Sequence, residues 1–231
     1  GVIPARYGST RFEGKLLKLF EGKTVIEHVY QRAKKASLLD DLLVAADDKR
    51  IFEAVESFGG KVVMTAADHV SGTDRIIETV GDLDTRLVIN IQGDEPLLVP
   101  EMVDQAALPL LEDKNLEVST LVKTCTDPDI YNDPNVVKAV LDKKGYAIYF
   151  SRYPIPHGGK IFYVHVGIYG YTKEFLLKFK DLPVSDLEKA ERLEQLRILE
   201  NGYRIKASVT EYETIGVDTP EDLEKIKQRY K

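Results

Sequence analysis

The sequence predicts an α/β fold in which helices cover a mostly parallel sheet. Two observations indicate it: short apolar runs alternate with helical patterns over the first half, and the helices begin and end at typical residues. Three or four such units in succession favour parallel strands. The expected strands span residues 1–4, 41–46, 61–64 and 86–91. The expected helices span residues 24–37, 48–60, 72–80 and 100–113.

Each of these helices carries a local signal. In the first, the residues at helical spacing are Val25, Ile26, Val29 and Ala33. Gly59 and Gly60 stop the second helix, and Pro109 is expected to kink or end the fourth.

The alternation of strands and helices does not continue in the second half of the chain. Strand-like runs at 116–125, 135–142 and 146–151 follow one another, with only turn residues between them and a hairpin at 143–145. These runs predict an inserted β-meander. A further strand at 165–172, a single helix at 185–202 and a last helix starting at Pro220 complete the chain. With no repeat or linker, residues 1–231 are expected to form one domain, with the meander at about 117–171.

Bulk composition excludes several classes of protein. The chain has 231 residues, of which 43% are hydrophobic and 30% charged, and its net charge is −6. An acidic balance argues against non-specific nucleic-acid binding. The single cysteine, Cys125, excludes an internal disulfide and fits a reducing compartment. Because neither a membrane span nor a signal peptide is visible, we expect no membrane partner and a cytoplasmic location.

A glycine-containing loop with three cations follows the first strand. The stretch "IPARYGSTRFEGK", residues 3–15, carries Arg6, Arg11 and Lys15, with glycines at 8 and 14. It matches neither G-x-G-x-x-G nor the Walker pattern. Glycines let a backbone approach a ligand, and cations neutralise phosphates. Phosphate binding and a solvated surface loop are about equally supported by the spacing alone.

Two aspartates are candidate metal ligands. Asp94 in "NIQGDEP" follows the fourth strand, and ligands of open α/β sheets lie at the strands' carboxyl ends. Asp218 in "GVDTPED" precedes the last helix. Aspartate is also a common turn residue and favours helix starts, so a structural role stays open for Asp94 and is favoured for Asp218.

The remaining candidates are equally open to structural interpretations. The turn Ser71-Gly72 before a helix, with Arg75 in its first turn, suits either a nucleotide contact or a plain helix start. His165, within a strand, is more typical of a structural hydrogen bond. The glutamates at positions 188, 191 and 194 recur every three residues and are typical of a solvated face, while Gln195 points towards the apolar side.

Taken in order, seven motifs resemble the 3-deoxy-manno-octulosonate (Kdo) cytidylyltransferases. The motifs are "IPARYGSTR", "DHVSGTDR", "NIQGDEP", "GYAIYFSRYPIP", "HVGIYGY", "LEQLR" and "GVDTPEDL". The resemblance runs from residue 1 to about residue 224. It implies a doubly wound mixed sheet of the nucleotide-diphospho-sugar transferase type, with the meander used for homodimerisation. The implied reaction transfers CMP from CTP to Kdo, an acidic eight-carbon sugar, for lipopolysaccharide synthesis.

The resemblance also implies a set of site residues. For nucleotide binding they are Arg6, Gly8, Ser9, Arg11, Lys15, Ser71, Gly72, Arg75, Gln92 and Asp94. For sugar binding they are Gln92, Arg152, His165, Tyr169, Glu194 and Gln195. Asp94 and Asp218 are the implied Mg²⁺ ligands, and with Arg11 and Lys15 they form the implied catalytic set. Only this resemblance favours functional roles for Asp218, His165 and Glu194.

The chain departs from the family pattern at several positions. Glu13, Leu16 and Thr24 stand where the family usually has proline. The family usually has an arginine shortly after the "IP" of S-R-x-x-I-P, whereas the loop here reads "HGGK". Lys160 is then the available cation, without arginine's bidentate geometry.

The expected chemistry is attack of the anomeric hydroxyl of the sugar on the α-phosphorus of CTP. Arg11 and Lys15 would neutralise the departing pyrophosphate, assisted by Arg6 and Arg75, and one or two Mg²⁺ ions would be held by the two aspartates. The alternatives are transfer to 8-amino-Kdo, less favourably to N-acetylneuraminate, or a non-catalytic CTP-binding regulator. The missing G-x-G-x-x-G excludes a Rossmann dehydrogenase.

Overall fold

The contacts within the chain divide it into two compact units. The computed structural model describes residues 1–9 and 11–230. The first unit comprises residues 1–104 and the C-terminal segment from residue 213 onward, and the second comprises residues 105–212. The single domain over residues 1–231 stays a prediction.

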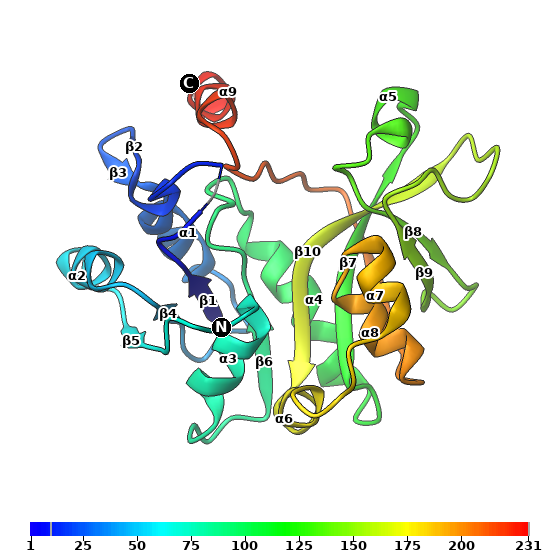
Figure 1. The fold of residues 1–231 in the computed structure, drawn as a ribbon, viewed down its shortest axis with the longest axis horizontal. Coiled ribbons are helices and arrows are strands. Elements are labelled where there is room, and N and C mark those ends of the chain that lie inside the picture. The colour runs from blue at the N-terminus through cyan, green and yellow to red at the C-terminus, as the bar shows by residue number, and fades with distance from the viewer. Residues whose placement is uncertain (10, 231) are drawn as a thin grey trace. The chain divides into compact units, whose positions relative to one another are not determined.

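Four parallel strands form the core of the first unit. In chain order they are β1 (Val2–Ala5), β4 (Leu43–Ala46), β5 (Val62–Met64) and β6 (Leu87–Asn90). They lie in the order β6-β1-β4-β5, and register pairs such as Ile3 with Val44 place fully buried side chains against each other. The predicted parallel sheet is confirmed, and Figure 1 shows β1, β4 and β5 next to one another.

The helices of the first unit begin where the sequence predicts. They are α1 (Val25–Ala33), α2 (Lys49–Ser57), α3 (Gly72–Val80) and α9 (Pro220–Tyr230). Ser71 and Asp74 form a reciprocal capping box at the start of α3. The side chains of Thr219 and Asp222 each accept a hydrogen bond from the other's backbone N–H at the start of α9. A 3-10 turn, η1 (Lys15–Leu17), and the short strands β2 (Leu19–Phe20) and β3 (Lys23–Thr24) precede α1 and were not predicted.

Helix α4 (Pro100–Glu112) continues through Pro109, so this proline does not end the helix, and the alternative expectation of a kink stays a prediction. The backbone N–H of Asp113 donates to the carbonyl oxygen of Pro109 at 3.0 Å, which extends the helical bonding past the proline. The apolar side chains of Ala106, Ala107 and Leu110 are buried around it. This packing holds the helix although proline lacks an N–H.

The second unit contains a mixed sheet rather than the predicted simple meander. Its strands are β7 (Val118–Cys125), β8 (Lys138–Leu141), β9 (Ala147–Ser151), β10 (Phe162–Thr172) and β11 (Ile205–Thr210). Strand β10 pairs antiparallel with both β7 and β8, so β8 does not follow β7 in the sheet. The β8–β9 hairpin is confirmed, with Gly145 at φ 77°, and β11 lies parallel to β7.

The helix predicted at 185–202 is two helices, α7 (Asp186–Glu191) and α8 (Gln195–Glu200). Arg192 ends α7 in the left-handed region, at φ 55°. The spacing of apolar and charged residues in α7 continues without interruption into α8. The sequence pattern therefore does not indicate the break between the two helices. Two short helices, α5 (Pro128–Asn132) and α6 (Lys173–Phe179), were also missed, and α5 interrupts the segment between β7 and β8 that was expected to hold only turn residues.

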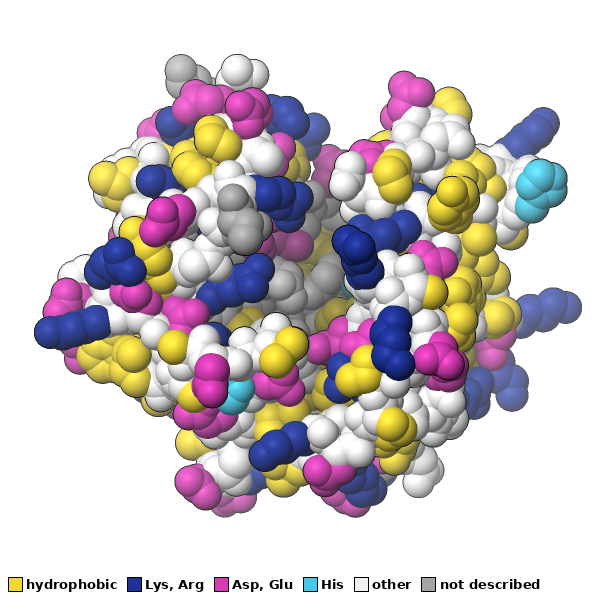
Figure 2. Space-filling view, in the orientation of Figure 1, with side chains coloured by type: hydrophobic (Ala, Val, Ile, Leu, Met, Phe, Trp, Pro, Cys, Tyr) yellow, Lys and Arg dark blue, Asp and Glu magenta, His cyan; other side chains and the backbone are white. Residues whose placement is uncertain are grey.

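Charged side chains of both signs are interspersed on the face shown in Figure 2. This agrees with a chain that has 32 basic and 38 acidic residues. Clusters of cations in such a protein therefore act over short distances, as the charges of neighbouring acids and the surrounding salt screen them.

Gly170 in β10 is a position where only glycine fits. A Cβ atom there would lie 2.7 Å from the carbonyl oxygen of Ala106 and 2.8 Å from Leu110 Cδ1, and closer still to Ser119 Oγ. We expect Gly170→Ala to lower the free energy of unfolding by about 2 kcal/mol or more, because a packed interior resists extra volume. Urea denaturation measures this.

The matched control is Gly81→Ala, where the carbonyl oxygen of Glu78 would lie 3.6 Å from the new Cβ, an ordinary contact distance. We expect that variant to keep the stability of the parent within about 0.5 kcal/mol. Equal stabilities for the two alanine variants would contradict the packing argument.

Candidate functional site

The loop after β1 folds back on itself to bring a lysine into a cavity. The backbone N–H of Tyr7 donates to Asp47 Oδ1 at 2.8 Å, and that of Gly14 donates to the carbonyl oxygen of Tyr7 at 3.2 Å. Gly14 adopts φ 63°, which favours glycine, and η1 begins directly after it. The loop is thus anchored at both ends, and Lys15 follows its second anchor.

Lys15 joins the two predicted metal ligands. Its Nζ lies 2.6 Å from Asp94 Oδ2 and 2.9 Å from Asp218 Oδ1. Arg11 Nη2 lies 2.8 Å from the other oxygen of Asp218, Oδ2. Burial opposes the charged form of Lys15, but the two carboxylates outweigh it and raise the Lys15 pKa. Two carboxylates and two cations from distant parts of the sequence therefore form one cluster.

Short backbone contacts place the two aspartates. Asp94 follows β6, and its carbonyl oxygen accepts a hydrogen bond from the backbone N–H of Val217 at 2.8 Å. This bond fixes the segment that carries Asp218 just before α9. Gly93 allows the close approach, since a Cβ there would lie 3.2 Å from Ile3 Cγ2 and from the carbonyl oxygen of Pro4.

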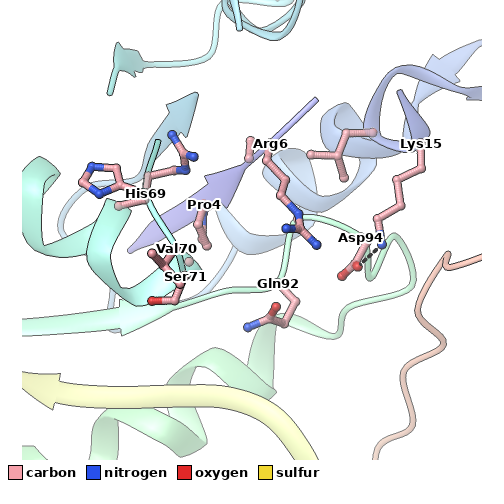
Figure 3. A pocket seen from close by; sticks show the side chains of 13 residues that line it. Pro4, Arg6, Lys15, His69, Val70, Ser71, Gln92 and Asp94 are labelled. Carbon is pink, nitrogen blue, oxygen red and sulfur yellow. Dashed lines mark hydrogen bonds and ion pairs between the residues drawn. The ribbon is translucent and has the colours of Figure 1, made fainter. Parts of the chain in front are cut away.

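A cavity of about 330 Å³ opens beside this cluster (Figure 3). Predicted nucleotide-binding residues that line it are Arg6, Lys15, Ser71, Gly72, Arg75, Gln92 and Asp94. Gly8, Ser9 and Arg11 do not line it, although Arg11 is linked to it through Asp218. In Figure 3, Arg6, Gln92 and Asp94 lie around one opening, and Lys15 reaches Asp94.

Arg75 forms part of the cavity wall rather than an exposed arm. Its side chain is only 4% exposed, and its guanidinium donates to Thr65 Oγ1, to the carbonyl oxygen of Ala66 at 3.1 Å and to Asp47 Oδ2 at 3.3 Å. Since Asp47 also holds the backbone of Tyr7, it connects the loop after β1 to α3. Asp47 follows a strand as Asp94 does, but it was missed because it lies outside the seven motifs on which the resemblance rests.

Two further residues near the cavity lie outside the predicted set of site residues. His69 lines the cavity and its Nε2 contacts the carboxylate of Glu78. Glu95, next to Asp94, has an oxygen, Oε2, without a hydrogen-bond partner among the described residues. Burial and the neighbouring charge of Asp94 raise the pKa of Glu95 to about 7.

The predicted sugar residues fall into two sets. Gln92 lines the cavity of the first unit, and the other five belong to the second unit. In the second unit, His165 Nε2 lies 3.0 Å from Thr120 Oγ1, and the rings of Phe150 and Tyr169 each lie 5.2 Å from the imidazole ring. Burial and the charge of Glu194 raise the pKa of Tyr169. His165, Tyr169 and Glu194 are thus brought into one neighbourhood, and Gln195 is buried at the start of α8.

Arg152 is held by an acid that was expected to be solvated. Glu191 accepts from Ser151 Oγ at 2.7 Å and from the backbone N–H of Arg152 at 2.9 Å, and its carbonyl oxygen accepts from Arg152 Nε at 2.9 Å. Glu188 pairs with Arg197 at 2.6 Å, with both side chains mostly buried. The prediction of a solvated glutamate face is therefore wrong, because the carboxylates of Glu188 and Glu191 bind protein groups instead.

Lys138 is a fully buried cation in the same region. Its Nζ donates to the carbonyl oxygens of Asp133 at 2.8 Å, of Val136 at 2.7 Å and of Arg152. Burial lowers the pKa of Lys138. Within the alternating strand pattern of β8, nothing in the sequence distinguishes this lysine from an exposed one.

Comparison with known proteins decides the family. A family model for cytidylyltransferases matches residues 1–208. A 3-deoxy-manno-octulosonate cytidylyltransferase of Solibacter usitatus (strain Ellin6076) is 51% identical, with 100% of this chain and 94% of that protein covered. The chain belongs to the 3-deoxy-manno-octulosonate cytidylyltransferase family. A protein of the same name from Geotalea daltonii (strain DSM 22248 / JCM 15807 / FRC-32) is 49% identical over 100% of this chain and 97% of its own length.

Solved structures agree with the family. A CMP:2-keto-3-deoxy-manno-octonic acid synthetase complexed with CTP superimposes with a TM-score of 0.94 at 41% identity, covering 99% of this chain and 96% of that one. A 4-diphosphocytidyl-2C-methyl-D-erythritol synthase from Anaerococcus prevotii DSM 20548, at 14% identity and a TM-score of 0.66, covers 99% of this chain and 94% of that one and shares the fold. The predicted α/β fold class with a mixed sheet is confirmed. The prediction that the chain is a nucleotidyltransferase is also confirmed, since it belongs to the 3-deoxy-manno-octulosonate cytidylyltransferase family. In the part of the chain that is described, no helix is long and apolar enough to cross a membrane.

The burial of His165 predicts a specific pH dependence of stability. Burial lowers its pKa to about 4, whereas an unfolded histidine titrates near the ordinary value of 6.5. The neutral ring stabilises the folded protein fully at a pH above the pKa of the unfolded state. This stabilisation is lost as the pH falls from there towards the pKa of the folded state. When the pH is lowered from about 7.5 to about 5, we expect the free energy of unfolding of the parent to fall by about 2 kcal/mol more than that of His165→Gln.

Chemical denaturation at the two pH values measures this difference. The exposed His157 provides the control, and we expect His157→Gln to retain the parental pH dependence. Identical pH dependence in the parent and His165→Gln would show that the pKa of His165 is the same in the folded and the unfolded protein, and would contradict the prediction.

Proposed function

We propose that this chain transfers CMP from CTP to the anomeric hydroxyl of Kdo, releasing pyrophosphate and forming CMP-Kdo. Its product is then the sugar donor for lipopolysaccharide synthesis. Full-length relatives of that name and the related synthetase complexed with CTP support the assignment. The observation that carries it is the convergence of Lys15, Asp94 and Asp218 beside a cavity lined by the predicted nucleotide-binding residues.

The cations of the loop after β1 suit a departing pyrophosphate. The anomeric hydroxyl gives its proton to water, and its oxygen forms a bond to the α-phosphorus. The bond between the α-phosphorus and the bridging oxygen breaks, so negative charge develops on the bridging oxygen. Arg11 and Lys15 neutralise it, and Arg6 contributes at the edge of the cavity. The side chain of Ser71 and the backbone at Gly72 contact the nucleotide, and Gly8 and Ser9 shape the loop. Arg75 supports this side of the cavity from its buried position.

The two aspartates fit a divalent metal ion. An ammonium nitrogen already lies within 2.9 Å of oxygens from both side chains, so both carboxylates are aimed at one point. Nucleotidyltransferases of this kind generally use a divalent metal, and carboxylate oxygens suit Mg²⁺. When bound, Mg²⁺ would stabilise charge on the phosphate oxygens and acidify the attacking hydroxyl.

The second unit supplies groups suited to an acidic sugar. His165 is neutral at pH 7 because burial lowers its pKa to about 4, so it offers a hydrogen bond rather than a charge. Arg152 supplies a cation for the carboxylate, with Lys160 as a further point charge. Tyr169, Glu194 and Gln195 provide hydroxyl-binding groups in this unit, and Gln92 provides one in the first unit.

We also propose a cytoplasmic homodimer. Exposed large apolar side chains in the second unit support an interface there. They include Ile148, Tyr153 and Ile161, which are 59%, 78% and 65% exposed.

Pyrophosphate release from CTP and Mg²⁺ tests the reaction. We expect release with Kdo and background release with 8-amino-Kdo, with N-acetylneuraminate and without sugar. Preference for 8-amino-Kdo would contradict the sugar assignment and would connect it to the short "HGGK" loop. CTP binding without release with any sugar would indicate the regulator instead.

Asp94→Asn tests the metal role. We expect at least about a 100-fold loss of turnover, comparable with removal of one charge-stabilising group from other active sites. Circular dichroism should show an unchanged fold, since the amide replaces the carboxylate with nearly the same shape. Asp82→Asn, an exposed position after α3, is the control and should retain parental turnover. A fully active Asp94→Asn protein would remove Asp94 from the metal site.

A further inference from the structure

The position between Asp94 and Asp218 is filled by a side chain of the protein itself. Lys15 Nζ contacts one oxygen of each carboxylate, at 2.6 and 2.9 Å, and it is only 12% exposed. Arg11 takes the remaining oxygen of Asp218 at 2.8 Å. Three of the four oxygens of the two carboxylates are therefore already bound to cations.

We propose that Lys15 competes with the divalent metal ion for this position, so that the metal binds only together with the nucleotide. Before the nucleotide arrives, Lys15 acts as the counter-ion that holds the two carboxylates close to each other. The triphosphate then attracts Lys15 and Arg11, and the carboxylates become available to the metal. This inference rests on the proposed function in one respect, namely that the two aspartates are the metal ligands for a nucleotide substrate.

The charges of the cluster support this competition. Two carboxylates contribute −2, and Lys15 with Arg11 contributes +2, so the four groups sum to zero. A divalent ion entering this neutral cluster would face two cations at short range. Such repulsion is substantial in a partly buried site. A triphosphate reverses the balance, because it brings several negative charges.

The number of ligands supports it too. Among the residues that the structure describes, no group of three or more His, Cys, Asp or Glu side chains is arranged to hold a metal. The protein thus offers two carboxylates at this point. Mg²⁺ is commonly bound by one or two carboxylates together with substrate phosphates and water. The remaining ligands must therefore come from water or from the phosphates of the nucleotide, and the phosphates add negative charge.

The location of Lys15 allows the exchange. Lys15 begins η1, directly after the loop anchor at Gly14, and it lines the same cavity as Arg6 and Ser71. Figure 3 shows the extended Lys15 side chain reaching Asp94 at the side of the opening where Arg6 lies. A rotation of this flexible side chain can therefore exchange carboxylate for phosphate without movement of the backbone.

Binding of Mn²⁺ to the full chain, followed by the electron paramagnetic resonance signal of the free ion, tests the proposal. Without CTP, we expect Lys15→Met to bind Mn²⁺ about tenfold or more tightly than the parent, because one repelling charge is gone. Lys15→Arg keeps the charge and should bind as weakly as the parent. Lys18→Met, at an exposed lysine outside the cavity, is the matched control and should change nothing.

Two further measurements show whether the tighter Mn²⁺ binding arises at the carboxylates. Adding Asp94→Asn to Lys15→Met should remove the gain, which places the ion at the carboxylates. CTP should strengthen Mn²⁺ binding to the parent far more than to Lys15→Met. Thermal denaturation confirms that each variant is folded, and Lys15→Gln replaces Lys15→Met if the latter unfolds.

Equal Mn²⁺ affinity of the parent and Lys15→Met without CTP would overturn the proposal, and so would an equal gain in Lys15→Arg. The measurement contains no sugar and needs no turnover. A negative result in the pyrophosphate assay together with the expected Mn²⁺ result would therefore reject the sugar assignment and leave the competition by Lys15 standing.

Discussion

The ammonium of Lys15 is held by carboxylates from two segments that lie 79 and 203 positions away in the sequence. The rest of the candidate site depends on this interaction. The loop after β1 must return at Gly14 to deliver the lysine, and the chain must turn at Gly93, after β6, to deliver Asp94. The segment before α9 must be fixed by the Val217 bond to deliver Asp218. A half-buried cation without these acids would be costly, and two neighbouring carboxylates without the cation would repel each other.

The sequence predicts the first unit well because its signals are local. Each strand is a short apolar run, and each helix begins at a residue such as Thr24 or Ser71 whose side chain caps it. The positions of Asp94 and Asp218 also follow from local rules, since both lie at junctions where a strand or loop meets the next element. Their mutual contact with Lys15 does not follow from such rules, because it depends on three-dimensional packing of distant segments.

The second unit shows where these rules fail. Strand order depends on long-range pairing, so the local runs that predicted a meander carry no information that β10 lies between β7 and β8. The break at Arg192 requires a left-handed residue that the sequence does not mark with glycine. Glu191 and Lys138 look like surface residues in the one-dimensional pattern, and only the tertiary structure shows that they hold the backbone around Arg152. Residue spacing alone did not distinguish a functional role from a structural one for the sugar-site residues, and only the resemblance to a family indicated the functional role.

The cations of this protein divide into two kinds according to their partners. Arg75, 4% exposed, and Lys138, fully buried, bind carbonyl and hydroxyl groups as well as any nearby acid. Their removal would leave buried acceptors unsatisfied, so they are permanent parts of the framework. Lys15 and Arg11 bind only carboxylates among the contacts described for their charged ends, and Arg11 is 62% exposed. A carboxylate can exchange an ammonium for a metal ion, and the ammonium can exchange a carboxylate for a phosphate, without leaving either group unpaired. The same chemistry therefore makes the first pair of cations structural and the second pair suited to a reaction in which substrate charge arrives and product charge leaves.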